Sequence, residues 1–260
     1  MDYRKIFDTI PDEFDKWRPR YCDELFSDII ESAKLDSSKT VLEIGPGTGQ
    51  ATEPILKTGC AYLAIELGEN FAEFMNRKYK SYDNFKLVNA DFELYDFVKD
   101  SFDFVYSAAA FQWIKEDIGY PKVFDMLKSG GVFATFGISA GRRDSVLNDK
   151  INEVYANVEL WNPEFDYDNY IKTRNSADEL DKIEKLRKYG FVDAERRHYS
   201  NIREFNSEDY ISYIQTSSPQ LSLKEPYKSK FYAAIRDIVM DADDSITIID
   251  DIVLHIARKP

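Results

Sequence analysis

The 260-residue sequence has few residues that bind metals or form disulfides, with two cysteines and two histidines. Cys22 and Cys60 cannot form a disulfide framework or a four-cysteine zinc site, so we expect two ordinary reduced thiols. His198 and His255 lie too far apart in the sequence to form a metal-binding signature. No metal is therefore predicted.

Long apolar runs and long basic runs are also missing. No stretch approaches the roughly 20 apolar residues that a membrane span requires, and the N-terminal sequence has no signal-peptide core. The chain has 47 acidic against 34 basic residues and a net charge of -13, which repels phosphate backbones. These absences predict a soluble cytoplasmic protein that acts on a small molecule, without nucleic-acid or membrane partners.

Short β-rich runs alternate with segments of helical character. This alternation predicts an α/β fold with a doubly wound, mostly parallel sheet of seven strands. A final strand is expected to close that sheet beside its predecessor. The predicted strands are found within residues 40–45, 61–66, 85–90, 102–108, 131–139, 192–205 and 252–259.

The length favours a single domain, residues 1–260, with helical cap insertions. Helices are expected near 149–160, over 176–191 and within 207–242, and the two insertions over the pocket are expected to form a lid that closes on substrate. The predicted core comprises about 38–139, 176–206 and 245–260, and the predicted cap about 1–37, 140–175 and 207–244.

The run "VLEIGPGTGQ", residues 41–50, ends the first strand with Gly45, Gly47 and Gly49 at alternate positions. Glycines let the chain turn sharply and let a ligand touch the backbone at the following helix N-terminus. Glu66 ends the second strand about 20 residues on, where a carboxylate binds the hydroxyls of a ribose. This spacing predicts an adenosine derivative as the ligand.

The residue after the glycines distinguishes among adenosine derivatives. A dinucleotide fold has the spacing G-x-G-x-x-G, but its third glycine would fall at Gln50. Glu43 lies two residues upstream of the first glycine, where it would repel a pyrophosphate and attract an ammonium group. S-adenosylmethionine carries that ammonium and no phosphate, so we predict it as the cofactor.

The ordered motifs resemble those of class I S-adenosylmethionine-dependent methyltransferases, in particular the small-molecule branch that includes trans-aconitate methyltransferase-like proteins. The N-terminal "FDKWRPRY" is similar to a segment common in that branch. The motifs that carry the resemblance are "VLEIGPGTGQ", "ADFE" (90–93), "FDFVYSAAAFQW" (102–113) and "LKSGG" (127–131).

The resemblance implies a Rossmann-like methyltransferase fold and a set of cofactor-binding residues. Gly45, Gly47 and Gly49 would lie against the methionine part, with Gln50 adjacent and Glu43 near its amino group. Glu66 would bind the ribose. The remaining cofactor positions implied are Leu67, Asp91 and Phe92 around the adenine, and Ser107 and Ala108 beside the sulfonium.

Methyl transfer from a sulfonium is a direct displacement that depends on proximity and orientation. Members of this branch often have His where this chain has Gln112, which removes a possible general base. A carboxylate acceptor, which the resemblance suggests, needs no base, and an arginine could orient it. The candidates for the substrate pocket are Trp17, Arg18, Phe111, Gln112, Trp113, Arg142 and Arg143.

Other interpretations stay open at this point. The arginines can be surface ion pairs, the aromatic residues can be core, and "TSS" at 216–218 is expected to cap or pad the second insertion. A non-catalytic S-adenosylmethionine-binding protein is the main alternative, and a nicotinamide-dependent oxidoreductase is disfavoured by Gln50 and Glu43. The sequence does not specify the methyl acceptor, the atom methylated or the oligomeric state.

Overall fold

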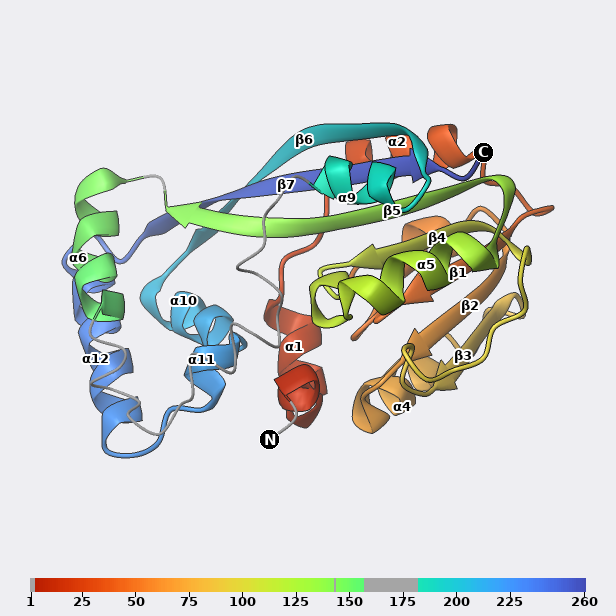
Figure 1. Cartoon of the computed structure of the whole chain (residues 1–260). Helices are drawn as coiled ribbons and strands as arrows, with labels where there is room; N and C mark the ends of the chain where they lie inside the picture. The colour runs from red at the N-terminus through yellow and green to blue at the C-terminus, as the bar shows by residue number, and fades with distance from the viewer. Residues whose placement is uncertain (1–2, 143, 157–181) are drawn as a thin grey trace.

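The computed structural model describes residues 3–142, 144–156 and 182–260. Within those residues one sheet has seven strands in the order β3-β2-β1-β4-β5-β7-β6 (Figure 1). Neighbours among β1 to β5 are parallel, and β7 is antiparallel to both β5 and β6. The predicted fold class is confirmed. The strands are β1 (Thr40–Ile44), β2 (Ala61–Glu66), β3 (Phe85–Asn89), β4 (Phe102–Ala108), β5 (Leu127–Arg142), β6 (Val192–Phe205) and β7 (Ile246–Arg258).

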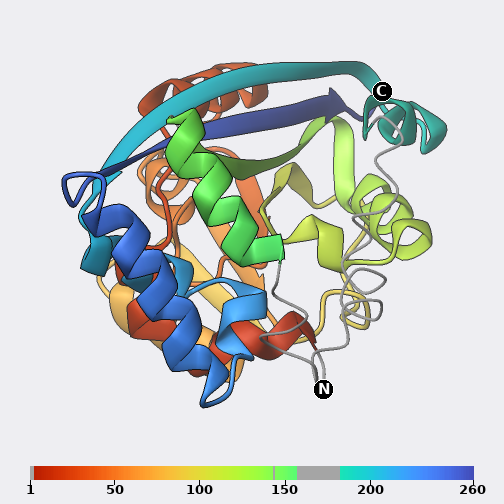
Figure 2. The same cartoon turned by 90° about the vertical axis from the view of Figure 1, so that its left-hand side faces the viewer.

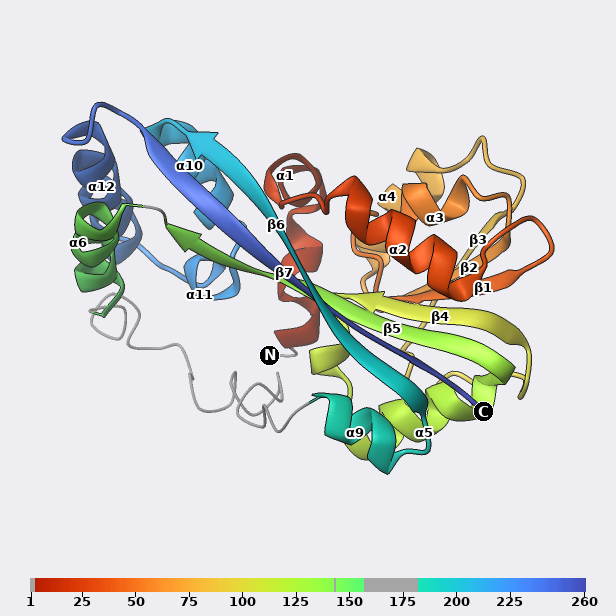
Figure 3. The ribbon, with the colours of Figure 1, turned by 90° about the horizontal axis from the view of Figure 1, so that it is seen from above.

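Helices cover both faces of the sheet (Figure 3). One face packs against α2 to α4 through residues such as Ile29, Ile55 and Met75, and the other packs against α5 and α9 through Val123 and Leu186. The helices of these two layers are α2 (Asp23–Ala33), α3 (Thr52–Leu56), α4 (Glu69–Lys78), α5 (Glu116–Met126) and α9 (Lys182–Lys188). Because both faces of β1 are covered, all of its residues from Val41 to Ile44 are buried.

Three strands extend well beyond the core and carry the cap (Figures 1 and 2). Strand β5 continues to Arg142 instead of ending at the predicted residue 139, and β7 begins at Ile246 instead of residue 252. The extension persists because β7 is paired on both sides, with Arg142 opposite Ile248 and Phe205 opposite Ile246. Its backbone groups are thereby hydrogen-bonded far from the core.

The cap helices pack on one another around a separate apolar cluster that includes Ile151, Phe231 and Ile235. The predicted helix near 149–160 begins earlier, and residues 157–160 and 176–181 of the predicted helices lie outside the described part. The cap helices are α6 (Ser145–Ala156), α10 (Ser207–Ile214), α11 (Ser218–Leu221) and α12 (Tyr227–Met240).

The N-terminal segment lies between the cap and the core sheet (Figures 1 and 3). It consists of η1 (Tyr3–Thr9) and α1 (Pro11–Trp17). Ile6 is buried against Phe7, Trp113 and Leu221, in a small cluster separate from the two layers of the core. Across the described residues, no helix has the length and apolar character needed to cross a membrane.

Candidate functional site

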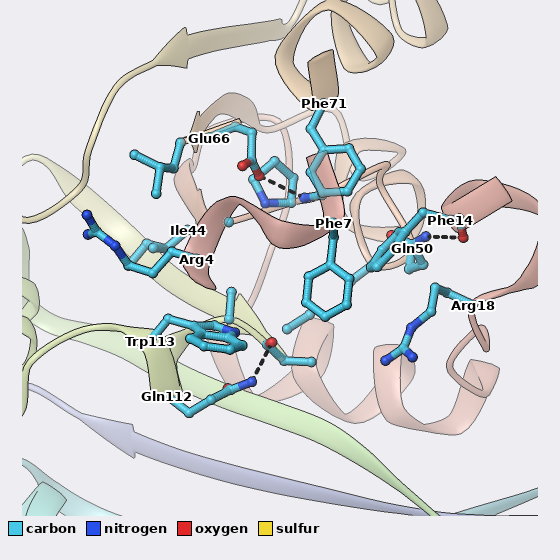
Figure 4. Close-up of a pocket in the computed structure, with 18 of the residues that line it drawn as sticks. Arg4, Phe7, Phe14, Arg18, Ile44, Gln50, Glu66, Phe71, Gln112 and Trp113 are labelled. Carbon is cyan, nitrogen blue, oxygen red and sulfur yellow. Dashed lines mark hydrogen bonds between the residues drawn. The ribbon is translucent and has the colours of Figure 1, made fainter. Parts of the chain in front are cut away.

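A cavity of about 460 Å³ lies at the carboxyl ends of the parallel strands (Figure 4). This volume is typical of sites for small ligands and cofactors. Four segments that end or follow β1 to β4 form part of its wall, namely residues 44–47, 65–67, 90–92 and 108–110. The cavity is therefore at the edge where open α/β sheets bind their ligands.

The glycine turn brings bare backbone to this cavity. Gly45 and Gly47 line it and have left-handed φ angles of +67° and +59°. A Cβ on Gly45 would lie 2.6 Å from the Cβ of Ala110, closer than two carbons can pack. The two glycines are needed because the chain must turn in a conformation that side chains disfavour while passing close to the segment after β4.

Gly49 has a different role from the other two glycines. It does not line the cavity, and a Cβ there, at φ +85°, would lie 2.7 Å from the Tyr79 hydroxyl oxygen. That hydroxyl donates a hydrogen bond to the Gly49 carbonyl over 3.2 Å. Gly49 thus lets the turn pack against Tyr79, which follows α4, and its predicted contact with the cofactor stays a prediction.

Glu66 is buried in the cavity wall beside the glycine turn. Its Oε2 accepts a hydrogen bond from the Gly47 amide over 3.0 Å, and its Oε1 accepts one from the Gly68 amide over 2.8 Å. Burial raises the pKa of Glu66 to about 7, although these amide bonds act in the opposite direction. The carboxylate retains lone pairs that hydroxyl groups of a ligand can use.

Glu43 lies behind the turn and does not line the cavity. Alternate residues of a strand face opposite sides, so Glu43 shares the face of Val41, toward the layer of α2 to α4. Its Oε2 accepts hydrogen bonds from Thr52 Oγ1 over 2.5 Å and from Tyr62 Oη over 2.6 Å, and Tyr62 in turn contacts Tyr106.

The carboxyl of Glu43 is fully buried, and burial raises its pKa to about 7. Its Oε1 has no hydrogen-bond partner among the described residues. Side-chain hydrogen bonds from the neighbouring hydroxyls lower this pKa but do not outweigh burial. The predicted contact of Glu43 with the cofactor's amino group stays a prediction, and Glu43 does not reach the cavity surface.

Most of the other predicted cofactor positions do line the cavity. They are Gln50, Leu67, Asp91, Phe92 and Ala108. The exception is Ser107, which is buried and donates a hydrogen bond to the Ile44 carbonyl over 2.8 Å. Ser107 therefore joins β4 to β1 below the cavity.

Three predicted substrate-pocket residues, Arg18, Gln112 and Trp113, also line the cavity (Figure 4). The Gln112 side chain is oriented by a hydrogen bond from Nε2 to the Ala109 carbonyl over 2.7 Å. Phe111 does not line the cavity. It is buried in the core, with its ring 5.1 Å from the Phe133 ring.

The remaining candidates lie elsewhere. Trp17 is not in the cavity wall, and the ammonium of Lys16 lies 4.5 Å from its ring centroid. Arg142 donates to Asn148 Oδ1 over 2.8 Å and also hydrogen-bonds Asn152, so it braces α6 instead of facing the cavity. Arg143 lies outside the described residues.

Several cavity residues were missed by the sequence reasoning. Arg4, Phe7, Phe14 and Tyr21 come from the N-terminal segment, and Ile138 comes from β5. The only sequence signal for this group is the "FDKWRPRY" similarity, which includes Phe14 and Tyr21. Nothing in the sequence marks Arg4 or Phe7, because they reach the cavity only when the N-terminal segment folds back over the ends of the strands.

The "TSS" stretch also differs from its predicted padding role. Ser217 and Ser218 line the cavity with Pro219, whereas Thr216 donates its hydroxyl to the Tyr213 carbonyl over 2.7 Å. Ser217 is at the N-cap of α11, but its side chain makes no capping hydrogen bond. Its hydroxyl is thus not used in the way that an N-cap serine normally is.

No set of three or more Asp, Glu, His and Cys side chains in the described ranges is arranged to hold a metal ion. The cavity instead combines a buried carboxylate, the bare backbone of a glycine turn, an aspartate after β3 and two arginines of the N-terminal segment, Arg4 and Arg18. This combination suits a nucleoside that carries a zwitterionic tail.

Residues 42–135 match the family model described as a methyltransferase domain. The matched segment runs from β1 into β5 and contains the glycine turn, Glu66 and Asp91. It is similar to the ribosomal RNA small subunit methyltransferase A of Dehalococcoides mccartyi, with 38% identity over 63 residues, 24% of this chain and 22% of that one. The chain thus spans less than a third of that relative's length.

Two solved structures share the fold over most of this chain. A protein of Anaeromyxobacter dehalogenans, assigned as a type II methyltransferase, has a TM-score of 0.65 and 16% identity, covering 93% of this chain and 97% of that one. Phosphoethanolamine N-methyltransferase 2 of Haemonchus contortus, in complex with phosphomonomethylethanolamine and S-adenosylhomocysteine, has a TM-score of 0.59 and 17% identity. It covers 99% of this chain and 60% of that one.

Proposed function

We propose that this protein binds S-adenosylmethionine in the cavity and transfers its methyl group to a small carboxylic acid. The observation that carries the proposal is the joining of Glu66 to the glycine turn at the carboxyl ends of the parallel strands. One carboxylate there faces the space for a ribose, while its bond to the Gly47 amide holds the turn that would receive the methionine part.

The cofactor's adenosine would lie between the ends of β2 and β3. Glu66 would accept the ribose hydroxyls, and Leu67 and Phe92 would flank the adenine with Asp91 at its amino group. Gly45 and Gly47 would lie against the methionine part, where a side chain would take up the space. This placement directs the methyl group toward Ala108 and the cap side of the cavity.

The cap side of the cavity favours an anionic acceptor. Glu66 and Asp91 are at the adenosine end, whereas Arg18 lines the cavity with Tyr21. A carboxylate held by Arg18 is already a nucleophile at neutral pH, so its oxygen can attack the methyl carbon as the carbon–sulfur bond breaks. The products are a methyl ester and S-adenosylhomocysteine.

The protein's contribution to this reaction is alignment. Holding the carboxylate oxygen, methyl carbon and sulfur in line can supply several kcal/mol of the rate acceleration. Gln112 is oriented by its bond to Ala109, and Ser217 and Ser218 add hydroxyl groups to the same wall. The net charge of -13 supports a small acceptor over a polynucleotide.

Calorimetric titration with S-adenosylhomocysteine and, separately, with NADH tests the cofactor. We expect binding of the first alone, lost in Glu66→Ala. Transfer of a labelled methyl group to a panel of small carboxylic acids then tests turnover, with Arg18→Ala against Arg20→Ala as the matched control, since Arg20 pairs with Asp15 at the surface.

The outcomes separate the alternatives. Cofactor binding without transfer to any acid would favour a non-catalytic binding protein or a different acceptor class. Binding of NADH instead would refute the assignment. An Arg18→Ala variant with unchanged KM for an accepted acid would refute the role of Arg18 in orienting the acceptor.

A further inference from the structure

We propose that η1, residues Tyr3–Thr9, is an adenosine strap whose Arg4 and Phe7 contact the bound cofactor and slow its release. The inference rests on the proposed function, because it takes the ligand to be an adenosine derivative. It adds two binding residues that no motif in the sequence marks. Both line the cavity with Glu66.

One end of the strap is anchored at the start of α4. Asp8 Oδ1 accepts a hydrogen bond from the Phe71 amide over 2.8 Å, and its Oδ2 accepts one from the Asn70 amide over 3.3 Å. The Asn70 side chain donates back to the Asp8 carbonyl over 2.9 Å. Amides in a first helical turn have no partner within the helix, so Asp8 satisfies two of them.

Gly68 makes this docking possible. A Cβ at Gly68 would lie 2.2 Å from Asp8 Oδ1, so any side chain there would push the strap away. Gly68 is also the residue whose amide donates to Glu66. The strap therefore meets the protein two residues from the carboxylate that we assign to the ribose.

The other end of the strap is anchored beyond β3. Arg4 Nη1 donates a hydrogen bond to Asp91 Oδ2 over 2.9 Å, and both side chains are mostly buried. Asp91 is the residue assigned to the adenine amino group, and its Oδ1 already accepts from the Glu93 amide. The two anchors thus lie at the ends of β2 and β3, on either side of the space assigned to the adenosine.

Between its anchors the strap presents apolar side chains. Phe7 lies against Phe14 with ring centroids 5.3 Å apart, and Phe14 lies 5.1 Å from Phe71 (Figure 4). Ile6 is buried against Trp113 and Leu221. The strap is therefore held by aromatic contacts around Phe7, by Trp113 of the cavity wall and by Leu221 of the cap.

These contacts give the strap a chemical role at the nucleoside. A guanidinium is planar and stacks on aromatic rings, so Arg4 can lie against the adenine while it balances the charge of Asp91. Phe7 adds an apolar surface at the same wall. Because both side chains line the wall of the cavity, the loss of either should speed the dissociation of a bound adenosine.

The test measures the dissociation rate of S-adenosylhomocysteine and of adenosine by stopped flow, with affinities from calorimetry. For Arg4→Ala and for Phe7→Ala we expect rates about three- to tenfold faster, as for the loss of one hydrogen bond or ring contact. The factor should be the same for both ligands, because the contacts are with the nucleoside.

Arg77→Ala is the matched control. It removes an exposed pair with Asp12, 3.8 Å apart, which joins α4 to α1 outside the cavity. Its rates should equal those of the wild type. A similar increase in all three variants would mean that loosening the N-terminal segment is sufficient, and would refute direct contact.

Unchanged rates in both Arg4→Ala and Phe7→Ala would also overturn the strap. If the wild type binds adenosine but not S-adenosylhomocysteine, the methyltransferase proposal fails. The dissociation rates of adenosine from the variants then decide whether the strap contacts the nucleoside. If it binds neither ligand, both proposals are overturned.

Discussion

Cofactor binding should strengthen as the pH rises from 6 to 8, because Glu66 must be ionised to accept the ribose hydroxyls. Burial raises the pKa of this carboxyl to about 7 in the free protein. Both of its oxygens already accept amide hydrogen bonds, from Gly47 and Gly68. A proton on either oxygen would remove lone pairs that the ligand needs.

The size of the effect follows from that pKa. With a pKa near 7, about a tenth of the Glu66 side chains are ionised at pH 6 and about nine tenths at pH 8. If the ligand binds only the ionised form, its Kd should fall about tenfold over this interval. Because binding selects that form, it should also release close to one proton per ligand at pH 6.

Calorimetry with S-adenosylhomocysteine at pH 6, 7 and 8, in two buffers of different ionisation enthalpy, measures both quantities. Glu66→Gln keeps the size of the side chain but cannot ionise, so its Kd should be weaker and nearly independent of pH. An equal pH dependence in this variant would mean that another group, such as Glu43, causes the change in Kd. A flat wild-type profile would refute the argument.

Two further predictions concern residues that support the site, and the free energy of unfolding tests both. Gly49→Ala should destabilise the protein by about 2 to 4 kcal/mol, from the positive φ and the overlap with Tyr79. Gly130→Ala is the control, because Gly130 has φ +77° and no atom lies within 4 Å of the added Cβ; its free energy of unfolding should fall by less. An equal fall in both variants would mean that the overlap with Tyr79 contributes nothing. Burial raises the pKa of Glu43 to about 7, so the folded state binds its proton more tightly, and this one carboxyl should lower the stability by on the order of 2 to 3 kcal/mol as the pH rises from about 4.5 to 7. Denaturation of Glu43→Gln should show a smaller slope over that range, and an unchanged slope would contradict this origin.

The fold class and the cofactor end of the site could be read from local patterns. In a parallel sheet, each strand's carboxyl end comes to the same edge, so residues such as Gly45, Glu66 and Asp91 were predicted together although they are far apart in the chain. Periodicity also predicted the alternation of strands and helices. Strand lengths were less predictable, because the extension of β5 to Arg142 depends on pairing with β7.

The acceptor end could not be predicted in the same way. Arg142 was a candidate because it follows a strand, but its guanidinium is held by α6. Ser217 and Ser218 reach the cavity because α10 and α11 fold back over the N-terminal segment. No local pattern in the sequence encodes such contacts between distant segments.

The sequence alone therefore determined the class of fold, the glycine turn and the carboxylate at the end of β2, since each depends on backbone conformation and residue type within a short stretch. Tertiary structure decided which side chains face the cavity from the N-terminal segment and the cap. It also raised the pKa values of Glu43 and Glu66. Burial and long-range packing exist only once the chain has folded, and they place Arg4 beside Asp91, 87 residues away in the sequence.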